Sequence, residues 1–316
     1  MRAISFDVPT GKGEPTLTQV DAPKPQPRSD EVLVRISHAA LNYLDYENQL
    51  GEHNKALRKN LKTSPVVSGI EMAGRVESDG RKFKKGDPVF GYTHIFKGPW
   101  FHAEYVALKE TNLAHVPEGL TAEGATSIVG GAVTAISALE KLAKTKSGDE
   151  VLITGATGSV GITALHLARH LGANVTAVCH SSQKDFARSE GATTVLAYDQ
   201  NDPIPTDAKF DTVFDTAPSL SFAKAKPYLK PCGTYVTTMP HLDIPGFFGA
   251  LLSSRKWGFL LESNTDEKRL SRLVTLMSEG AFRPVVDSSY PLAEAAQAFA
   301  RQRRRGRRGK IILTME

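Results

Sequence analysis

The stretch from Glu150 to Gly161, EVLITGATGSVG, decides how we expect this chain to fold. An apolar strand ends there in a turn of small residues, and the turn opens directly into the helical stretch ITALHLARHLG. Such a turn brings backbone N–H groups and the positive end of a helix dipole to a bound pyrophosphate, whereas the alternative is a simple packing turn. The spacing is AxGxxG, and a second apolar strand, NVTAVCH, follows. We therefore predict a dinucleotide site made by Ala156, Thr157, Gly158, Ser159, Val160 and Gly161.

The sequence on either side divides into two kinds of structure. From about Thr121 onward, apolar strands alternate with helical patterns, which favours an α/β fold with a doubly wound parallel sheet. The first third consists of short β-rich runs separated by Gly, Pro and charged residues, a pattern typical of an irregular antiparallel barrel. The apolar strand KIILTM comes last, after two helical stretches. We expect it to return to the barrel.

The end of the second strand indicates which dinucleotide binds. An NAD site usually places a carboxylate about 20 residues beyond the fingerprint, where it meets the ribose hydroxyls. Here that position falls on His180, and the run His180, Ser181, Ser182 and Gln183 contains no acid. Lys184 and Arg188 follow and offer cations to a 2′-phosphate, although Lys184 would also suit the start of a surface helix. We predict NADPH as the cofactor.

Composition fits a folded protein of two domains. The 316 residues are 41% hydrophobic and 23% charged. Only Cys179 and Cys232 are cysteines, too few for a disulfide framework or a four-ligand structural zinc site. No run approaches the roughly 20 apolar residues that cross a bilayer. We expect a cytoplasmic protein without a membrane partner.

The net charge of +5 comes from one short segment, because seven Lys and Arg residues lie between Arg301 and Lys310. They stand between a helical stretch and the final strand, with no interleaved aromatic residues. Such a cluster is typical of a solvated helix end that interacts favourably with the helix dipole. We therefore expect no nucleic-acid partner.

A series of short motifs runs along essentially the whole chain. Together, in their order and spacing, they resemble the zinc-free quinone oxidoreductase branch of the medium-chain dehydrogenase/reductase superfamily. They are LNYLD (41–45), GIEMAGRV (69–76), KKGDPVFG (84–91), AEYV (103–106), GGAVTA (130–135), GATGSVG (155–161), DTA (215–217), LKPCGTYV (229–236) and GKIILT (309–314).

The resemblance implies a Rossmann cofactor-binding domain over 124–264 and a GroES-like irregular β-barrel, the catalytic domain, over 1–123 with 265–316. It also implies a homodimer that pairs through the region of Trp257 to Leu261. The site residues that it implies are Asn42, Asp45 and Thr134 beside nicotinamide and substrate, Ser181, Lys184 and Tyr198 around the adenosine phosphate, and Asp215, Thr216 and Lys310 at the cofactor. From the residues alone, Asn42 and Asp45 could instead hold a turn, and Thr134 could bond its own helix.

Zinc-binding relatives carry Cys where this chain has Asn42, His where it has Ile70, and a further Cys near Gly130. Hydride transfer to an isolated carbonyl makes a localised alkoxide, which a Lewis-acid metal stabilises. A quinone or enone spreads the charge by conjugation, so hydrogen-bond donors or water suffice. The resemblance thus implies a zinc-independent reductase of conjugated acceptors.

Two features depart from the common pattern of the family. Glu52 and His53 stand where quinone reductases often carry a tyrosine, and His53 is either a proton donor or a solvent-facing side chain. The stretch IPGFFGALLSSRKWGF is equally individual and suits a ligand pocket or a dimer edge. Two alternatives therefore stay open: a pathway-specific enone or enoyl-thioester reductase, and a non-catalytic NADPH-binding protein with a structural or RNA-binding role.

Overall fold

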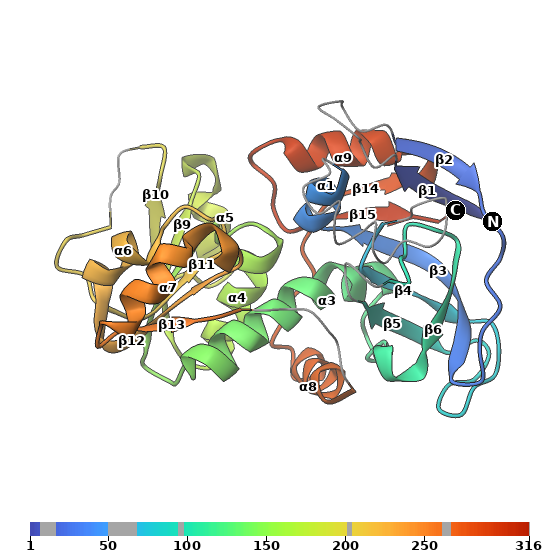
Figure 1. Ribbon diagram of the computed structural model, residues 1–316, viewed down its shortest axis with the longest axis horizontal. Helices are drawn as coiled ribbons and strands as arrows, with labels where there is room; N and C mark the ends of the chain where they lie inside the picture. Colours follow the sequence, from blue (N-terminus) through green and yellow to red (C-terminus); the bar gives the residue numbers. More distant parts are fainter. Residues whose placement is uncertain (7–16, 50–67, 94–97, 201–203, 261–266, 316) are drawn as a thin grey trace.

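The computed structural model of the chain describes residues 1–6, 17–49, 68–93, 98–200, 204–260 and 267–315. These residues form two lobes, each built around one sheet (Figure 1). The α/β sheet and the β-rich GroES-like lobe expected from the sequence are both confirmed.

The first lobe holds six parallel strands in the order β10-β9-β8-β11-β12-β13. Helices lie on both faces of this sheet (Figure 1), and accordingly the strand EVLIT is buried at four of its five positions. Its strands are β8 (Glu150–Thr154), β9 (Asn174–Cys179), β10 (Thr194–Ala197), β11 (Phe210–Asp215), β12 (Leu229–Thr237) and β13 (Lys256–Gly258). Its helices are α4 (Ser159–His170), α5 (Lys184–Ser189), α6 (Phe222–Ala225) and α7 (Ile244–Leu251).

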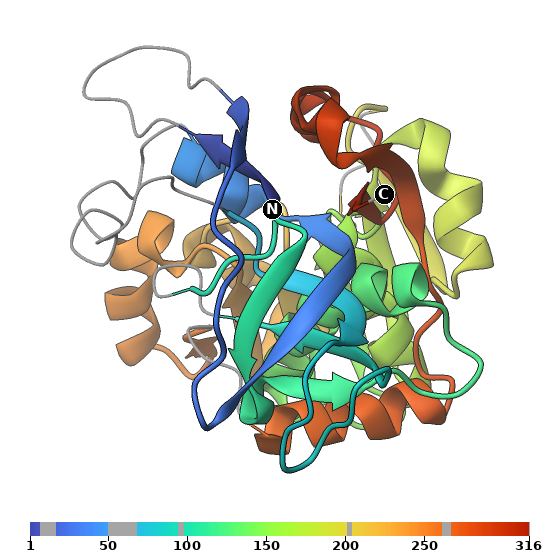
Figure 2. The same ribbon diagram turned by 90° about the vertical axis from the view of Figure 1, so that its right-hand side faces the viewer.

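The second lobe is the expected barrel-like arrangement, seen face-on in Figure 2. Its sheet runs in the order β14-β15-β3-β4-β5-β7, with β6 also paired to β3. The strands are β3 (Glu31–Leu41), β4 (Glu71–Val76), β5 (Pro88–Tyr92), β6 (Tyr105–Lys109), β7 (Leu113–His115), β14 (Val286–Pro291) and β15 (Lys310–Thr314), and β1 (Arg2–Phe6) pairs separately with β2 (Leu17–Asp21). The final strand does return to this lobe, because β15 lies antiparallel to β3.

Helix α3 (Ala122–Ala135) passes between the lobes (Figure 1) and begins at Thr121, whose side chain accepts a hydrogen bond from the Gly124 N–H at 3.0 Å. It continues as a π-helix to Ala143 and ends at Lys144, which adopts left-handed backbone angles. Within the described residues, the segment 122–143 alone is long and apolar enough to span a bilayer, but 83% of it is buried inside the protein. It is a core helix.

One hydrophobic core runs through both lobes along α3. It joins side chains of the second lobe, such as Phe90, to strand residues of the first, such as Val151. Helix α8 (Glu267–Ser278) closes the core from below in Figure 1 with its buried leucines, among them Leu273. The remaining helices are α1 (Tyr43–Gln49) and α9 (Ala295–Arg303), which contact each other. A shared core predicts that the two lobes unfold together.

Leu273→Ala tests this shared core, because the side chain is fully buried. Its truncation should lower the free energy of unfolding by about 2–5 kcal/mol. Trp100 lies in one lobe and Trp257 in the other, so urea unfolding can be followed by fluorescence in Trp100→Phe and Trp257→Phe backgrounds. Both reporters should shift together, and the exposed control Lys268→Ala should shift neither. A shift confined to one reporter would contradict the shared core.

Candidate functional site

The turn between β8 and α4 lines a large cavity with a volume of about 1360 Å³. The chain reverses so tightly here that a Cβ on Gly161 would lie 2.1 Å from the Gly155 carbonyl oxygen. Only glycine fits, and the backbone of the turn is left facing the cavity. This volume exceeds the roughly 300–1000 Å³ of common ligand pockets. It leaves room for a dinucleotide and a second molecule.

Ser159 at the start of α4 provides independent support for an anion at this turn. Its Oγ atom is buried and has no hydrogen-bond partner within the described residues, although Ser159 lines the cavity. Buried hydroxyls rarely remain unpaired, and the first turn of a helix also presents free N–H groups and a positive dipole end. The turn and Ser159 therefore fit the pyrophosphate of a dinucleotide.

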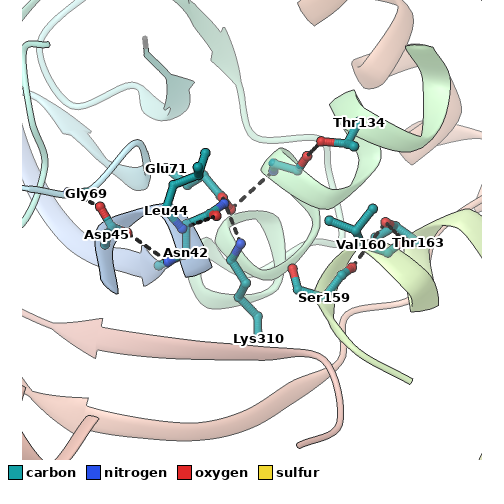
Figure 3. Close-up of polar contacts among 12 residues, drawn as sticks. Asn42, Leu44, Asp45, Gly69, Glu71, Thr134, Ser159, Val160, Thr163 and Lys310 are labelled. Carbon is teal, nitrogen blue, oxygen red and sulfur yellow. Dashed lines mark hydrogen bonds and ion pairs between the residues drawn. The ribbon is translucent and has the colours of Figure 1, made fainter. Parts of the chain in front are cut away.

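A buried ion pair lies at the centre of the cleft (Figure 3). Glu71 at the start of β4 is fully buried, and its Oε1 atom accepts a hydrogen bond from the ammonium of Lys310 in β15 at 2.7 Å. Asn42 Nδ2 donates to the same oxygen at 2.9 Å, and the Gly130 N–H donates to Oε2 at 3.2 Å. A Cβ on Gly130 would collide with this carboxylate. Glu71 thus fixes two cavity-lining side chains, Asn42 and Lys310.

The expectation for Asp45 needs correction. Asp45 is fully buried and does not line the cavity; its two carboxylate oxygens accept the N–H groups of Asn42 at 2.8 Å and Gly69 at 2.9 Å. Burial raises the pKa of this carboxyl. Asp45 therefore holds the turn that presents Asn42. Thr134 does line the cavity, and its hydroxyl donates to the Gly130 carbonyl at 2.8 Å, as the sequence allowed.

Two more predicted cofactor residues face away from the cavity. Asp215 is buried at the end of β11, where it accepts hydrogen bonds from Thr154 Oγ1 and from the loop after the strand. It organises that loop, whereas its neighbour Thr216 does line the cavity. Ala156 is fully buried and packs into the core. Asp215 therefore has a structural role through its hydrogen bonds, and Ala156 has one through its packing.

Hydrogen bonds connect the turns that follow β8 and β9 to the segment before β15. Thr157 Oγ1 donates to Gln183 Oε1 at 2.7 Å, and Gln183 Nε2 donates to the Arg307 carbonyl at 2.9 Å. The Gly309 N–H donates to the Thr157 carbonyl at 2.9 Å. These hydrogen bonds join the turn between β8 and α4 in the first lobe to the segment before β15 in the second lobe. Gln183 could not be predicted from the sequence as part of the site, because nothing local shows that an amide beside the strand end is buried.

The basic segment is solvated at the end of α9, as expected, because Arg303, Arg304, Arg305 and Arg308 are exposed. It also contributes to the wall of the cavity, and Arg308 donates to the Ser182 carbonyl at 3.3 Å. The members in the lining are Arg303, Arg304, Arg305, Arg307 and Lys310. The positive charge of the chain thus gathers at the cleft.

The predicted residues of the adenosine end lie together beyond β9 and β10. His180 and Tyr198 line the cavity, with their rings 5.8 Å apart in a T-shaped arrangement. Ser181, Ser182 and Lys184 follow His180 in the short turn and helix after β9 but are not part of the cavity lining. Asp199, which sequence analysis overlooked, contacts Ser181 with its carboxylate. An acid at the end of the neighbouring strand was the missed signal.

The opposite end of the cavity is apolar. Helix α7, strand β13, the segment before α7 and the residue after β13 contribute Met239, Ile244, Phe247, Phe248, Trp257 and Phe259, and α1 contributes Leu44. Glu52 and His53 lie outside the described residues. No group of three His, Cys, Asp or Glu side chains converges anywhere in the described part of the chain as a metal site would require. The cavity therefore combines a cationic end with an apolar end.

Two family models match the chain. Residues 28–125 match the alcohol dehydrogenase GroES-like domain, and residues 190–313 match a model described as zinc-binding dehydrogenase. The chain is 32% identical to the chloroplastic quinone-oxidoreductase QR1 of Triphysaria versicolor, over 99% of this chain and 98% of that protein. It is 30% identical to 2-methylene-furan-3-one reductase of Solanum lycopersicum, over 92% of this chain and 73% of that one. The quinone oxidoreductase structure from Coxiella burnetii superimposes with a TM-score of 0.88 at 27% identity, covering 100% and 99% of the two chains.

Glu71→Ala should be strongly destabilising, because it leaves the Lys310 ammonium buried without its counter-ion. Breaking such a pair costs about 3–5 kcal/mol, whereas removing both charges costs less. The double variant Glu71→Ala/Lys310→Met should therefore recover part of the lost stability. Urea unfolding of the two variants and the parent would measure this. A double variant less stable than Glu71→Ala would argue against the pair.

Proposed function

Because this chain belongs to the quinone oxidoreductase branch of the medium-chain dehydrogenase/reductase superfamily, we propose that it transfers hydride from NADPH to a quinone or an α,β-unsaturated carbonyl without zinc. One observation carries the proposal. The hydrogen-bonded group of Asn42, Glu71 and Lys310 occupies the cleft where zinc-binding relatives keep their ligands, beside a turn fitted to a dinucleotide. The proposed units are the catalytic domain of 1–123 with 265–316 and the cofactor-binding domain of 124–264.

The protein's part in this reaction is binding and electrostatics. When bound, the nicotinamide supplies the hydride. The N–H groups of the turn and the Ser159 hydroxyl would hold the pyrophosphate, with the cations at that end of the cavity nearby. Thr134 and Asn42 line the wall against which nicotinamide and acceptor would stack. Alignment of the two reactants in this cleft lowers the barrier.

Asn42 and Lys310 are the groups suited to stabilise charge on the acceptor. Glu71 accepts one N–H of the Asn42 amide, and the amide has a second that can be donated into the cleft. The Lys310 ammonium has three protons and spends one on Glu71. A conjugated acceptor delocalises its developing negative charge, so donors of this kind suffice without a Lewis acid. Asn42, Ile70 and Gly130 offer no thiolate or imidazole to a metal.

NADPH is the proposed cofactor because the turn after β9, from His180 to Gln183, carries no acid, while Lys184 and Arg308 bring cations to it. A dehydrogenase site selective for NAD would instead present a carboxylate from the end of this strand. Lys184→Ala should then reduce the preference for NADPH.

The enone class has support of its own within this proposal. The tomato relative is named for an enone substrate, and a relative from Aspergillus terreus, 28% identical, is named a trans-enoyl reductase. The same cleft would serve quinone, enone and enoyl-thioester acceptors. The basic segment lines the proposed cofactor cavity, which supports a role in cofactor binding rather than in binding nucleic acid.

Assembly and location complete the proposal. We propose a homodimer through β13, which lies at the edge of its sheet next to the half-exposed side chain of Phe259.

We also propose the cytoplasm as its compartment, since Cys179 and Cys232 are both unpaired. One relative named above is a chloroplastic protein, so fluorescence microscopy of a tagged chain would test the proposed compartment.

Purified protein should oxidise NADPH when 1,4-naphthoquinone or an enone such as methyl vinyl ketone is added, and chelators should leave the rate unchanged. The expected metal independence follows from the absence of thiolate and imidazole at Asn42, Ile70 and Gly130. Absorbance at 340 nm measures the rate, and elemental analysis measures metal content. Stoichiometric zinc, with activity lost on its removal and restored on its return, would refute zinc independence.

Asn42→Ala should lower kcat/KM for a quinone by roughly 10- to 100-fold at saturating NADPH, because it removes a donor to the developing charge. Most of the loss should appear in kcat. Asn174→Ala is the matched control, since Asn174 is exposed at the start of β9. Equal kinetics of Asn42→Ala and the parent would show that this amide does not act on the acceptor.

A further inference from the structure

A carboxylate, that of Asp199, lies next to the cavity-lining residues His180 and Tyr198, where the 2′-phosphate of NADPH is expected. Strand β10 lies parallel to β9, with Ala197 opposite Cys179, so the residues that follow the two strands are neighbours. Asp199 Oδ1 accepts the Ser181 N–H at 2.7 Å, and Asp199 Oδ2 accepts the Ser181 hydroxyl at 2.6 Å. Both donors of Ser181 are thereby committed to a carboxylate.

The imidazole of His180 lies beside the same Asp199 carboxylate. The Ser182 N–H donates to His180 Nδ1 at 3.2 Å, which leaves the ring proton on Nε2. His180 Nε2 lies 3.3 Å from Asp199 Oδ2. The hydrogen bonds from Ser181 lower the pKa of Asp199, so the group is charged at neutral pH. Ser181 and His180 therefore serve an anion that belongs to the protein.

We propose that Asp199 is a cofactor-specificity residue that opposes the 2′-phosphate and allows NADH to be used beside NADPH. A 2′-phosphate that reached the Ser181 donors would have to displace this carboxylate or lie beside it, and both alternatives cost free energy. The free 2′-hydroxyl of NADH carries no charge and can donate to a carboxylate. Lys184 and Arg308 act in the opposite direction, so the preference for NADPH is smaller than these cations alone would give.

This inference rests on the proposed function only in requiring a nicotinamide dinucleotide in the cleft. Its test is therefore a binding measurement that needs no turnover. The probes are 2′,5′-ADP, which carries the extra phosphate, and 5′-AMP, which lacks it, both titrated calorimetrically. The variants are Asp199→Asn, which removes the charge and keeps the shape of the side chain, and Asp199→Ser, which removes the charge and also shortens the side chain. The control is Asp185→Asn on α5, a fully exposed acid whose replacement makes the same change of charge.

Both Asp199 variants should bind 2′,5′-ADP about tenfold more tightly than the parent at low ionic strength, and added salt should reduce this gain. Neither variant should bind 5′-AMP more tightly than the parent, because the 2′-hydroxyl loses an acceptor. Asp185→Asn should change neither affinity more than about twofold. Equal changes for the two probes, no change, or the same gain in Asp185→Asn would overturn the inference. Binding of 2′,5′-ADP to none of the proteins would overturn it as well. If the shift is seen but no quinone or enone is reduced with either cofactor, the proposed function fails and the inference stands.

Discussion

The buried ion pair between Glu71 and Lys310 is the constraint on which the cleft depends. A charge without water around it must be compensated locally, so the carboxylate draws Lys310, Asn42 and the Gly130 N–H to one point. These partners come from β15, from the turn after β3 and from α3. The pair therefore fixes the relative positions of three elements that form the cleft floor.

The same cleft is polarised along its length. Arginines near the end of α9 and in the loop before β15, together with Lys310, give one part of the lining a positive charge, while α7 and β13 make the other part apolar. A dinucleotide carries its phosphates away from its nicotinamide, so a single molecule matches both the charged part and the start of the apolar part. The remaining apolar surface suits an uncharged, conjugated acceptor. Under the proposed function, this charge distribution would favour one direction of the cofactor in the cleft.

The fold was predictable from the sequence because its signals are local. The turn from Gly155 to Gly161, the strand before it and the helix after it are close in sequence, and each requirement is visible in residue size and periodicity. The site was only partly predictable. Asp45 and Asp215 look like ligand-facing acids, but their oxygens are spent on nearby backbone N–H groups and hydroxyls. Glu71 and Asp199 were missed since their partners, Lys310 and Ser181, are 239 and 18 residues away along the chain. Such pairings depend on how strands are laid side by side.

The distance between Glu71 and Lys310 along the chain has a consequence for folding during synthesis. Strands β3 and β4 emerge early, but the strand that pairs with β3 and carries the counter-ion of Glu71 follows it by 239 residues. Until then the Glu71 carboxylate must stay hydrated, since a nascent chain cannot bury it unpaired. The sheet of the GroES-like lobe is therefore complete only after the strands of the parallel sheet, which lie between β7 and β14 in sequence, have been synthesised. The ion pair that shapes the cleft can form only once β15 has joined β3.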